Sequence, residues 1–89
     1  MNMASRKNLK KTVNFIVSEL FTQCLVQKAV KGTDDDKVRE VLADILNLQS
    51  EFLSRANHTE PGNVTGFYRK YYDDFNAQVD VIYDKMNAF

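Results

Sequence analysis

The sequence predicts an all-α fold, an antiparallel up-down-up bundle of three long helices within a single domain that spans residues 1–89. Three observations lead to this prediction. The chain has only three glycines and one proline, which leaves little room for the many turns of a β-protein. Apolar residues recur at alternating spacings of three and four along three separate segments. The connection between the first two segments is only one or two residues long, which forces those two helices to be antiparallel neighbours.

The first helix is expected over residues 6–31, with Ser5 as its N-cap and Gly32 as the left-handed residue that ends it. One face of this helix carries a wide apolar stripe, which is broad enough to contact two neighbouring helices. The stripe consists of Leu9, Val13, Ile16, Val17, Leu20, Phe21, Cys24 and Leu25.

The second helix is expected over residues 34–57, because Thr33 is a suitable N-cap and three aspartates follow in the first turn. Its predicted core face consists of Val38, Val41, Leu42, Ile45, Leu48, Phe52, Leu53 and Ala56. The same aspartates do not match a calcium-binding loop, since Arg39 and Ile45 stand where that loop needs glycine and glutamate.

The third helix is expected over residues 65–88, after a loop in which Pro61 and Gly62 form a turn. Its apolar residues alternate strictly at four and three, as in a heptad seam, with Phe67 and Tyr71 beside that seam. The tyrosine rings are expected inside the bundle with their hydroxyl groups at its surface. The seam consists of Tyr68, Tyr72, Phe75, Val79, Ile82, Met86 and Phe89.

No catalytic, metal or cofactor site is predicted, and the chain is expected not to be an enzyme. The single histidine, His58, has no other histidine with which to hold a transition metal, and no glycine-rich phosphate loop occurs. No serine or cysteine has a base nearby in the sequence.

The side of the first helix opposite its stripe carries two apolar residues, Phe15 and Val26, with Glu19 and Thr22 between them. Because Phe15 and Val26 lie eleven residues apart, they point in the same direction. One interpretation is that they are ordinary exposed residues, which monomers tolerate. The other is that they form a contact face, which predicts a self-associating interaction or scaffolding protein, most simply a homodimer.

Charge is balanced overall but unevenly placed. An up-down-up bundle brings seven cations to one end, and cations in the first turn of a helix act against its dipole. The alternative hypothesis to self-association is that this end binds an acidic partner or a nucleic-acid backbone. The cations are Arg6, Lys7, Lys10, Lys11, Arg55, Arg69 and Lys70.

The single cysteine, Cys24, and the absence of any long apolar run favour a cytoplasmic protein that does not enter a membrane. The segment Arg6 to Phe21 (RKNLKKTVNFIVSELF) resembles the N-terminal helix of small helical proteins of Bacteroidetes-type bacteria. That group has no assigned activity, so the resemblance implies a bacterial cytoplasmic protein and nothing about its function.

Overall fold

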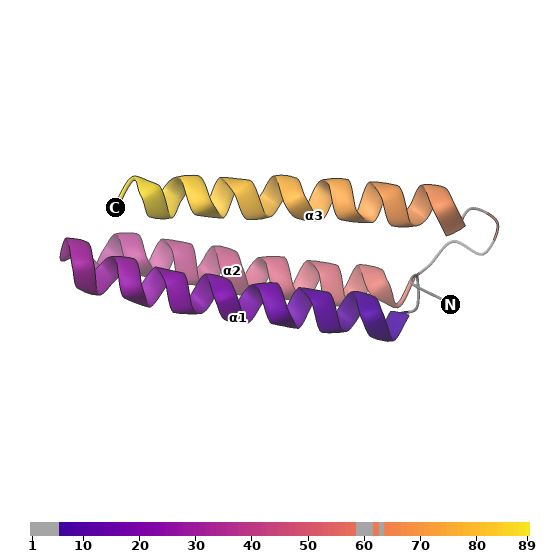
Figure 1. Ribbon diagram of the computed structural model, residues 1–89, viewed down its shortest axis with the longest axis horizontal. Coiled ribbons are helices and arrows are strands. Elements are labelled where there is room, and N and C mark those ends of the chain that lie inside the picture. Colours follow the sequence, from indigo (N-terminus) through magenta and orange to yellow (C-terminus); the bar gives the residue numbers. More distant parts are fainter. Residues whose placement is uncertain (1–5, 59–61, 63) are drawn as a thin grey trace.

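The computed structural model describes residues 6–58, 62 and 64–89, with the backbone alone at Arg6, and Figure 1 shows three helices lying side by side. They are α1 (Arg6–Lys31), α2 (Asp35–Ala56) and α3 (Val64–Asn87). Each helix runs antiparallel to the one before it, in a rod of 48 × 18 × 16 Å. The described residues contain no strand, so the predicted all-α three-helix bundle is confirmed. The predicted cap Ser5 lies outside the described residues.

All three helices contribute to one hydrophobic core, because each carries the apolar stripe that its spacing predicted. The eight predicted core positions of α2 are all buried or half-buried. The buried residues are Leu9, Val13, Val17, Leu20 and Cys24 from α1, Val38, Val41, Ile45, Leu48, Phe52 and Ala56 from α2, and Tyr71, Phe75, Ile82 and Met86 from α3.

The prediction for Leu25 is wrong, because 55% of this residue is exposed. Leu25 follows the buried Cys24 by one residue, which turns its side chain about 100° around the helix. Since α2 and α3 together cover only one side of α1, a residue at the edge of the stripe remains in solvent. The core of α1 is therefore narrower than the sequence indicated.

The prediction for the tyrosines of α3 needs a similar correction. Tyr71, expected beside the seam, is buried, whereas Tyr68 is only half-buried. The Tyr71 ring packs edge-on against Phe52 of α2 at 5.2 Å between centroids, and its hydroxyl donates a hydrogen bond to the Phe52 carbonyl at 2.6 Å. That hydroxyl is buried and does not reach the surface, because α2 lies against the Tyr71 flank of α3.

The connection between α1 and α2 begins at Gly32, whose φ of 62° confirms the predicted left-handed position. The backbone N–H groups of Gly32 and Thr33 both donate to the Lys28 carbonyl, at 2.9 and 3.3 Å. Thr33 is therefore part of the turn that closes α1, and the N-cap position of α2 falls on Asp34, one residue later than predicted. The Asp34 side chain makes no capping hydrogen bond, and the Thr33 hydroxyl is buried without a partner among the described residues.

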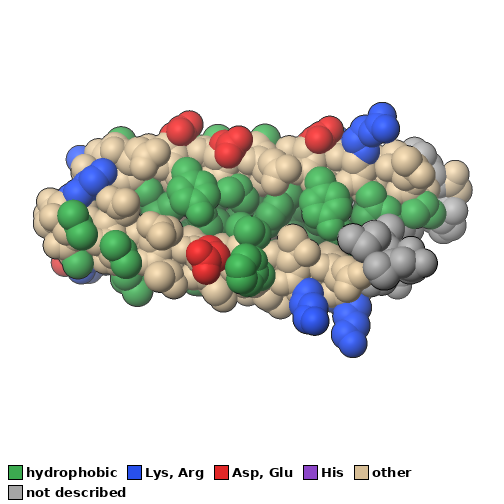
Figure 2. Space-filling view, viewed as in Figure 1, with side chains coloured by type: hydrophobic (Ala, Val, Ile, Leu, Met, Phe, Trp, Pro, Cys, Tyr) green, Lys and Arg blue, Asp and Glu red, His purple; other side chains and the backbone are tan. Residues whose placement is uncertain are grey.

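The three helices do not pack equally. α2 packs closely against both of its neighbours, whereas α1 and α3 touch only sparsely. Figure 2 shows a band of hydrophobic side chains along the line between α3 and the helix below it, which Figure 1 identifies as α1. We call this line the α1–α3 seam. The half-buried residues of α3 that pack against the core include Tyr72 and Val79.

Candidate functional site

The outer face of α1, which we define as Lys11, Phe15, Glu19, Thr22 and Val26, is exposed along its whole length. Phe15 is 65% exposed and Val26 47% exposed, as their spacing predicted. The hydroxyl of Thr22 donates to the Ser18 carbonyl of the preceding turn at 3.0 Å. Its hydrogen-bonding capacity is thus met within the helix, so covering Thr22 would not leave an unpaired donor.

Sequence reasoning missed two apolar residues that extend this surface. Val30 is exposed, and so is Leu25, which had been assigned to the core. With Phe15 and Val26, they make α1 the source of half of the eight large hydrophobic residues exposed in the described part of the chain. The signal for Val30 was present in its position one helical turn after Val26.

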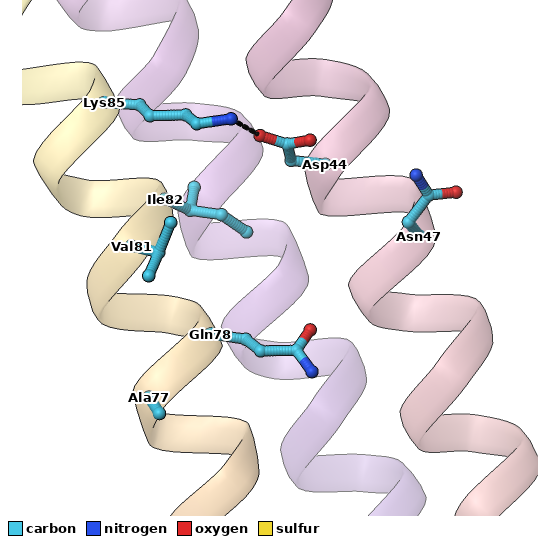
Figure 3. A pocket seen from close by; sticks show the side chains of 7 residues that line it. All are labelled: Asp44, Asn47, Ala77, Gln78, Val81, Ile82 and Lys85. Atoms are coloured by element: carbon cyan, nitrogen blue, oxygen red, sulfur yellow. Dashed lines mark hydrogen bonds and ion pairs between the residues drawn. The ribbon is translucent and has the colours of Figure 1, made fainter.

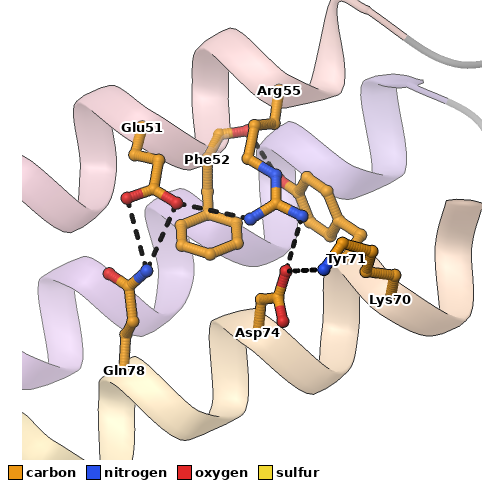
Figure 4. Close-up of polar contacts among 7 residues, drawn as sticks. All are labelled: Glu51, Phe52, Arg55, Lys70, Tyr71, Asp74 and Gln78. Carbon is orange, nitrogen blue, oxygen red and sulfur yellow. Dashed lines mark hydrogen bonds and ion pairs between the residues drawn. The ribbon is translucent and has the colours of Figure 1, made fainter.

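Arg55, one of the seven cations predicted to collect at one end, is held by two carboxylates (Figure 4). Its guanidinium donates to Asp74 of α3 at 2.9 Å and to Glu51 of α2 at 3.3 Å. It also lies over the Phe52 ring, 4.8 Å from the ring centroid, where a cation is attracted by the aromatic face. Arg55 therefore joins α2 to α3 and is not free to bind an anion.

Lys70 belongs to the same cluster, because its ammonium lies 3.2 Å from the Asp74 carboxylate. The hydrogen bond from Arg55, followed by that from Lys70, holds the pKa of Asp74 below its ordinary value, so this carboxylate stays ionised. Glu51 also accepts hydrogen bonds from Gln78 at 3.2 and 3.3 Å. The cluster is a polar connection between two helices.

The remaining predicted cations with described side chains, Lys7, Lys10, Lys11 and Arg69, make no ion pair with a described residue. Those of α1 stand near the start of a helix whose first turn has no acidic residue. The side chain of Arg6 is outside the described part of the structure. The basic end thus keeps about half of the cations that the sequence assigned to it.

A shallow hollow of about 340 Å³ lies between α2 and α3 (Figure 3). Its wall includes Val81 and Ile82, and Lys85 closes one end with its ammonium 2.6 Å from Asp44 and 3.1 Å from Glu40. The hydrogen bonds that Lys85 donates to Asp44, and then to Glu40, raise the pKa of its ammonium group. Lys85 is therefore protonated at neutral pH and cannot serve there as a base or nucleophile.

Cys24 has similarly low reactivity. It is a free, fully buried cysteine, and burial raises the pKa of its thiol, with Lys28 opposing the rise. Within residues 6–58, 62 and 64–89, no group of three or more histidine, cysteine or acidic side chains is placed to hold a metal ion. Across the same residues, no helix is both long and apolar enough to cross a membrane.

Comparison of the chain with protein-family models, with curated proteins and with solved structures found no match. The resemblance of residues 6–21 to small bacterial helical proteins therefore stays a prediction.

Proposed function

We propose that this chain is a small non-enzymatic interaction protein that self-associates through the outer face of α1. The observation that supports it is the concentration of exposed apolar side chains on that one helix, of which Phe15 at 65% exposure is the largest. Aromatic side chains, phenylalanine included, are enriched in the cores of protein–protein interfaces relative to the rest of the surface. The buried, free thiol of Cys24 agrees with a reducing, cytoplasmic location, which is part of the proposal.

The proposal is tested by the mass in solution, measured by size-exclusion chromatography with light scattering over a concentration series. The wild-type chain should shift from monomer to dimer as its concentration rises. Phe15→Glu combined with Val26→Lys should remain monomeric, because removing a central anchor costs about 2 kcal/mol or more of association free energy. A wild-type chain that stays monomeric at the highest concentration would overturn the proposal.

A matched control tests whether the loss of the dimer is specific to α1. Leu46 on α2 and Val81 on α3 are 53% and 54% exposed, so they are comparable apolar surface residues on other helices. Leu46→Glu combined with Val81→Lys introduces the same charges and should leave the dimer intact. Equal loss of assembly in both double variants would point to general charge effects and not to the outer face of α1.

A second candidate, binding of nucleic acid or another anion at the basic end, is supported by the cations that have no ion-pair partner among the described residues. Titration with a labelled short nucleic acid at about 50 mM salt should detect binding below about 100 μM if this candidate is correct. Lys10→Glu with Arg69→Glu should then abolish it without affecting assembly. Lys70 is unsuitable for this test because its substitution would disturb Asp74.

A further inference from the structure

The outer face of α1 carries opposite charges placed symmetrically around Phe15. Lys11 lies four residues before Phe15 and Glu19 four residues after it. Residues four apart are neighbours on a helix surface, so the three side chains form one row, and all three are exposed. If two copies of α1 cross antiparallel at Phe15, Lys11 of each copy lies opposite Glu19 of the other. This row is therefore complementary to itself.

Neither charge at the ends of this row is paired within the part of the chain that the structure describes. Lys11 and Glu19 make no ion pair with any described residue, whereas the charges that flank the contact of α2 with α3 are paired, as at Arg55 and Lys85. Both are thus available to a second molecule. An opposite charge in that molecule would gain an attraction with no existing pair to break.

The neighbouring row of α1 provides space for the aromatic ring of a second copy. Ser18, Thr22 and Val26 are also spaced by four, and their side chains are much smaller than that of Phe15. Two helices that insert such rows between one another cross at about −50°, the commonest helix-packing class. With the two Phe15 rings paired, Ser18 is the member of this row that lies beside them, one helical turn after Phe15.

Resting on the proposed function, we infer that the partner on this face is a second copy of the chain, docked antiparallel across α1 with the two-fold axis at Phe15. Two Lys11–Glu19 pairs fix the register on either side of the paired Phe15 rings. A two-fold contact uses the same surface on both copies and closes, so assembly stops at the dimer. A contact between single helices is small, under about 1,200 Å², and the dimer is accordingly weak and concentration-dependent.

Charge reversal tests this register, with dimer dissociation constants measured by analytical ultracentrifugation at low salt. Lys11→Glu and Glu19→Lys should each weaken the dimer roughly tenfold, because each replaces two attractions by two repulsions. The double reversal restores both pairs and should return the dissociation constant to near the wild-type value. Both positions are exposed, so circular dichroism should show unchanged helicity.

Mixing the two single variants adds an independent measurement. The Lys11→Glu chain is acidic at both ends of the row and the Glu19→Lys chain is basic at both, so the mixture should form heterodimers more tightly than either variant forms homodimers. Lys37→Glu and Asp80→Lys make the same changes in net charge at exposed positions on α2 and α3 that have no described ion-pair partner. These two control variants should dimerise like the wild type.

The outcomes separate the register from the proposed function. Suppose that the wild type dimerises with the same dissociation constant as Lys11→Glu, Glu19→Lys and the double reversal. Self-association then stands, and the antiparallel register is overturned. A parallel contact would place like charges opposite each other in the wild type and in each of these variants, so their dissociation constants would be equal. Only the mixture of Lys11→Glu with Glu19→Lys would then bind more tightly, because it pairs opposite charges. A wild type that is monomeric at every concentration overturns both the register and self-association.

Discussion

At the scale of single residues, Tyr71 links α3 to α2 through both its ring and its hydroxyl. Its ring lies between Phe52 and Tyr72, and its hydroxyl donates to the Phe52 carbonyl within the core. Burial, with a smaller contribution from Tyr72, raises the pKa of Tyr71 from 10.0 to about 12, while Arg55 opposes the rise. The neutral phenol is therefore the form that the folded chain stabilises.

Tyr71→Phe should lower the free energy of unfolding by about 1 kcal/mol at neutral pH, because it removes one buried hydrogen bond and keeps the ring. Urea unfolding monitored by circular dichroism measures the change. Tyr83→Phe is the control, since Tyr83 is exposed and makes no hydrogen bond to a described residue. An equal effect of the two substitutions would contradict the importance given to the Tyr71 hydroxyl.

The same residue predicts how stability depends on alkaline pH. Because the folded chain holds the Tyr71 proton more tightly than the unfolded chain, this contribution is complete below about pH 10 and is lost as pH rises toward about 12. The free energy of unfolding of the wild type should thus fall by up to about 2 to 3 kcal/mol over that pH interval because of Tyr71. In unfolding curves measured at several alkaline pH values, the free energy of unfolding of Tyr71→Phe should decline less than that of the wild type.

At the scale of the elements, Gly32 is the residue that ends α1 and sets the turn into α2. Gly32→Ala should destabilise the chain by about 1 kcal/mol, because an alanine rarely adopts its φ of 62°. A Cβ added there would meet no atom within 4 Å, so the cost is conformational and not steric. The change in urea midpoint measures it.

Gly62 offers a matched control for that substitution. A Cβ at Gly62 would also meet nothing within 4 Å, and its φ lies outside the left-handed region. Gly62→Ala should consequently leave stability unchanged or raise it slightly, by restricting the unfolded chain. If both alanines had the same effect, the left-handed conformation of Gly32 would not be what ends α1.

Element positions were well predicted from the sequence, because breakers and apolar spacing are local properties. The helix bounds of the structure lie within one residue of the predicted ones. Local spacing could not predict which flank of α3 is buried. Tyr68 and Tyr71 are both compatible with its seam, and the choice depends on the side from which α2 approaches.

Only some properties of the candidate site could be predicted, namely those that depend on a single helix. The exposure of Phe15 and Val26 follows from one helix alone, so it could be inferred from their spacing. The pairing of Arg55 with Asp74 depends on the register between α2 and α3, which spacing within either helix does not determine. The basic end therefore has fewer unpaired cations than predicted, whereas the predicted exposure of Phe15 and Val26 is confirmed.

At the scale of the whole molecule, the sparse α1–α3 seam divides the bundle into a closely packed α1–α2 hairpin and a third helix held mainly by α2. Regions with fewer tertiary contacts open at lower free energy. Amides of α3 should therefore exchange with solvent at least about tenfold faster than core amides of α1 and α2. Hydrogen exchange followed by NMR, at concentrations where the chain is monomeric, measures this difference.

Equal protection in all three helices would mean that the bundle opens as a single cooperative unit. Tyr71→Phe offers a check on the interpretation, because it weakens the contact of α3 with α2 specifically. It should accelerate exchange in α3 more than in the α1–α2 hairpin.

The odd number of antiparallel helices has a mechanical consequence. The chain enters α1 at one end of the 48 Å rod and leaves α3 at the opposite end, as Figure 1 shows. Tension applied between these two points acts parallel to the helices. The helices must then slide along one another, moving whole rows of packed side chains together, and cannot be peeled apart one contact at a time.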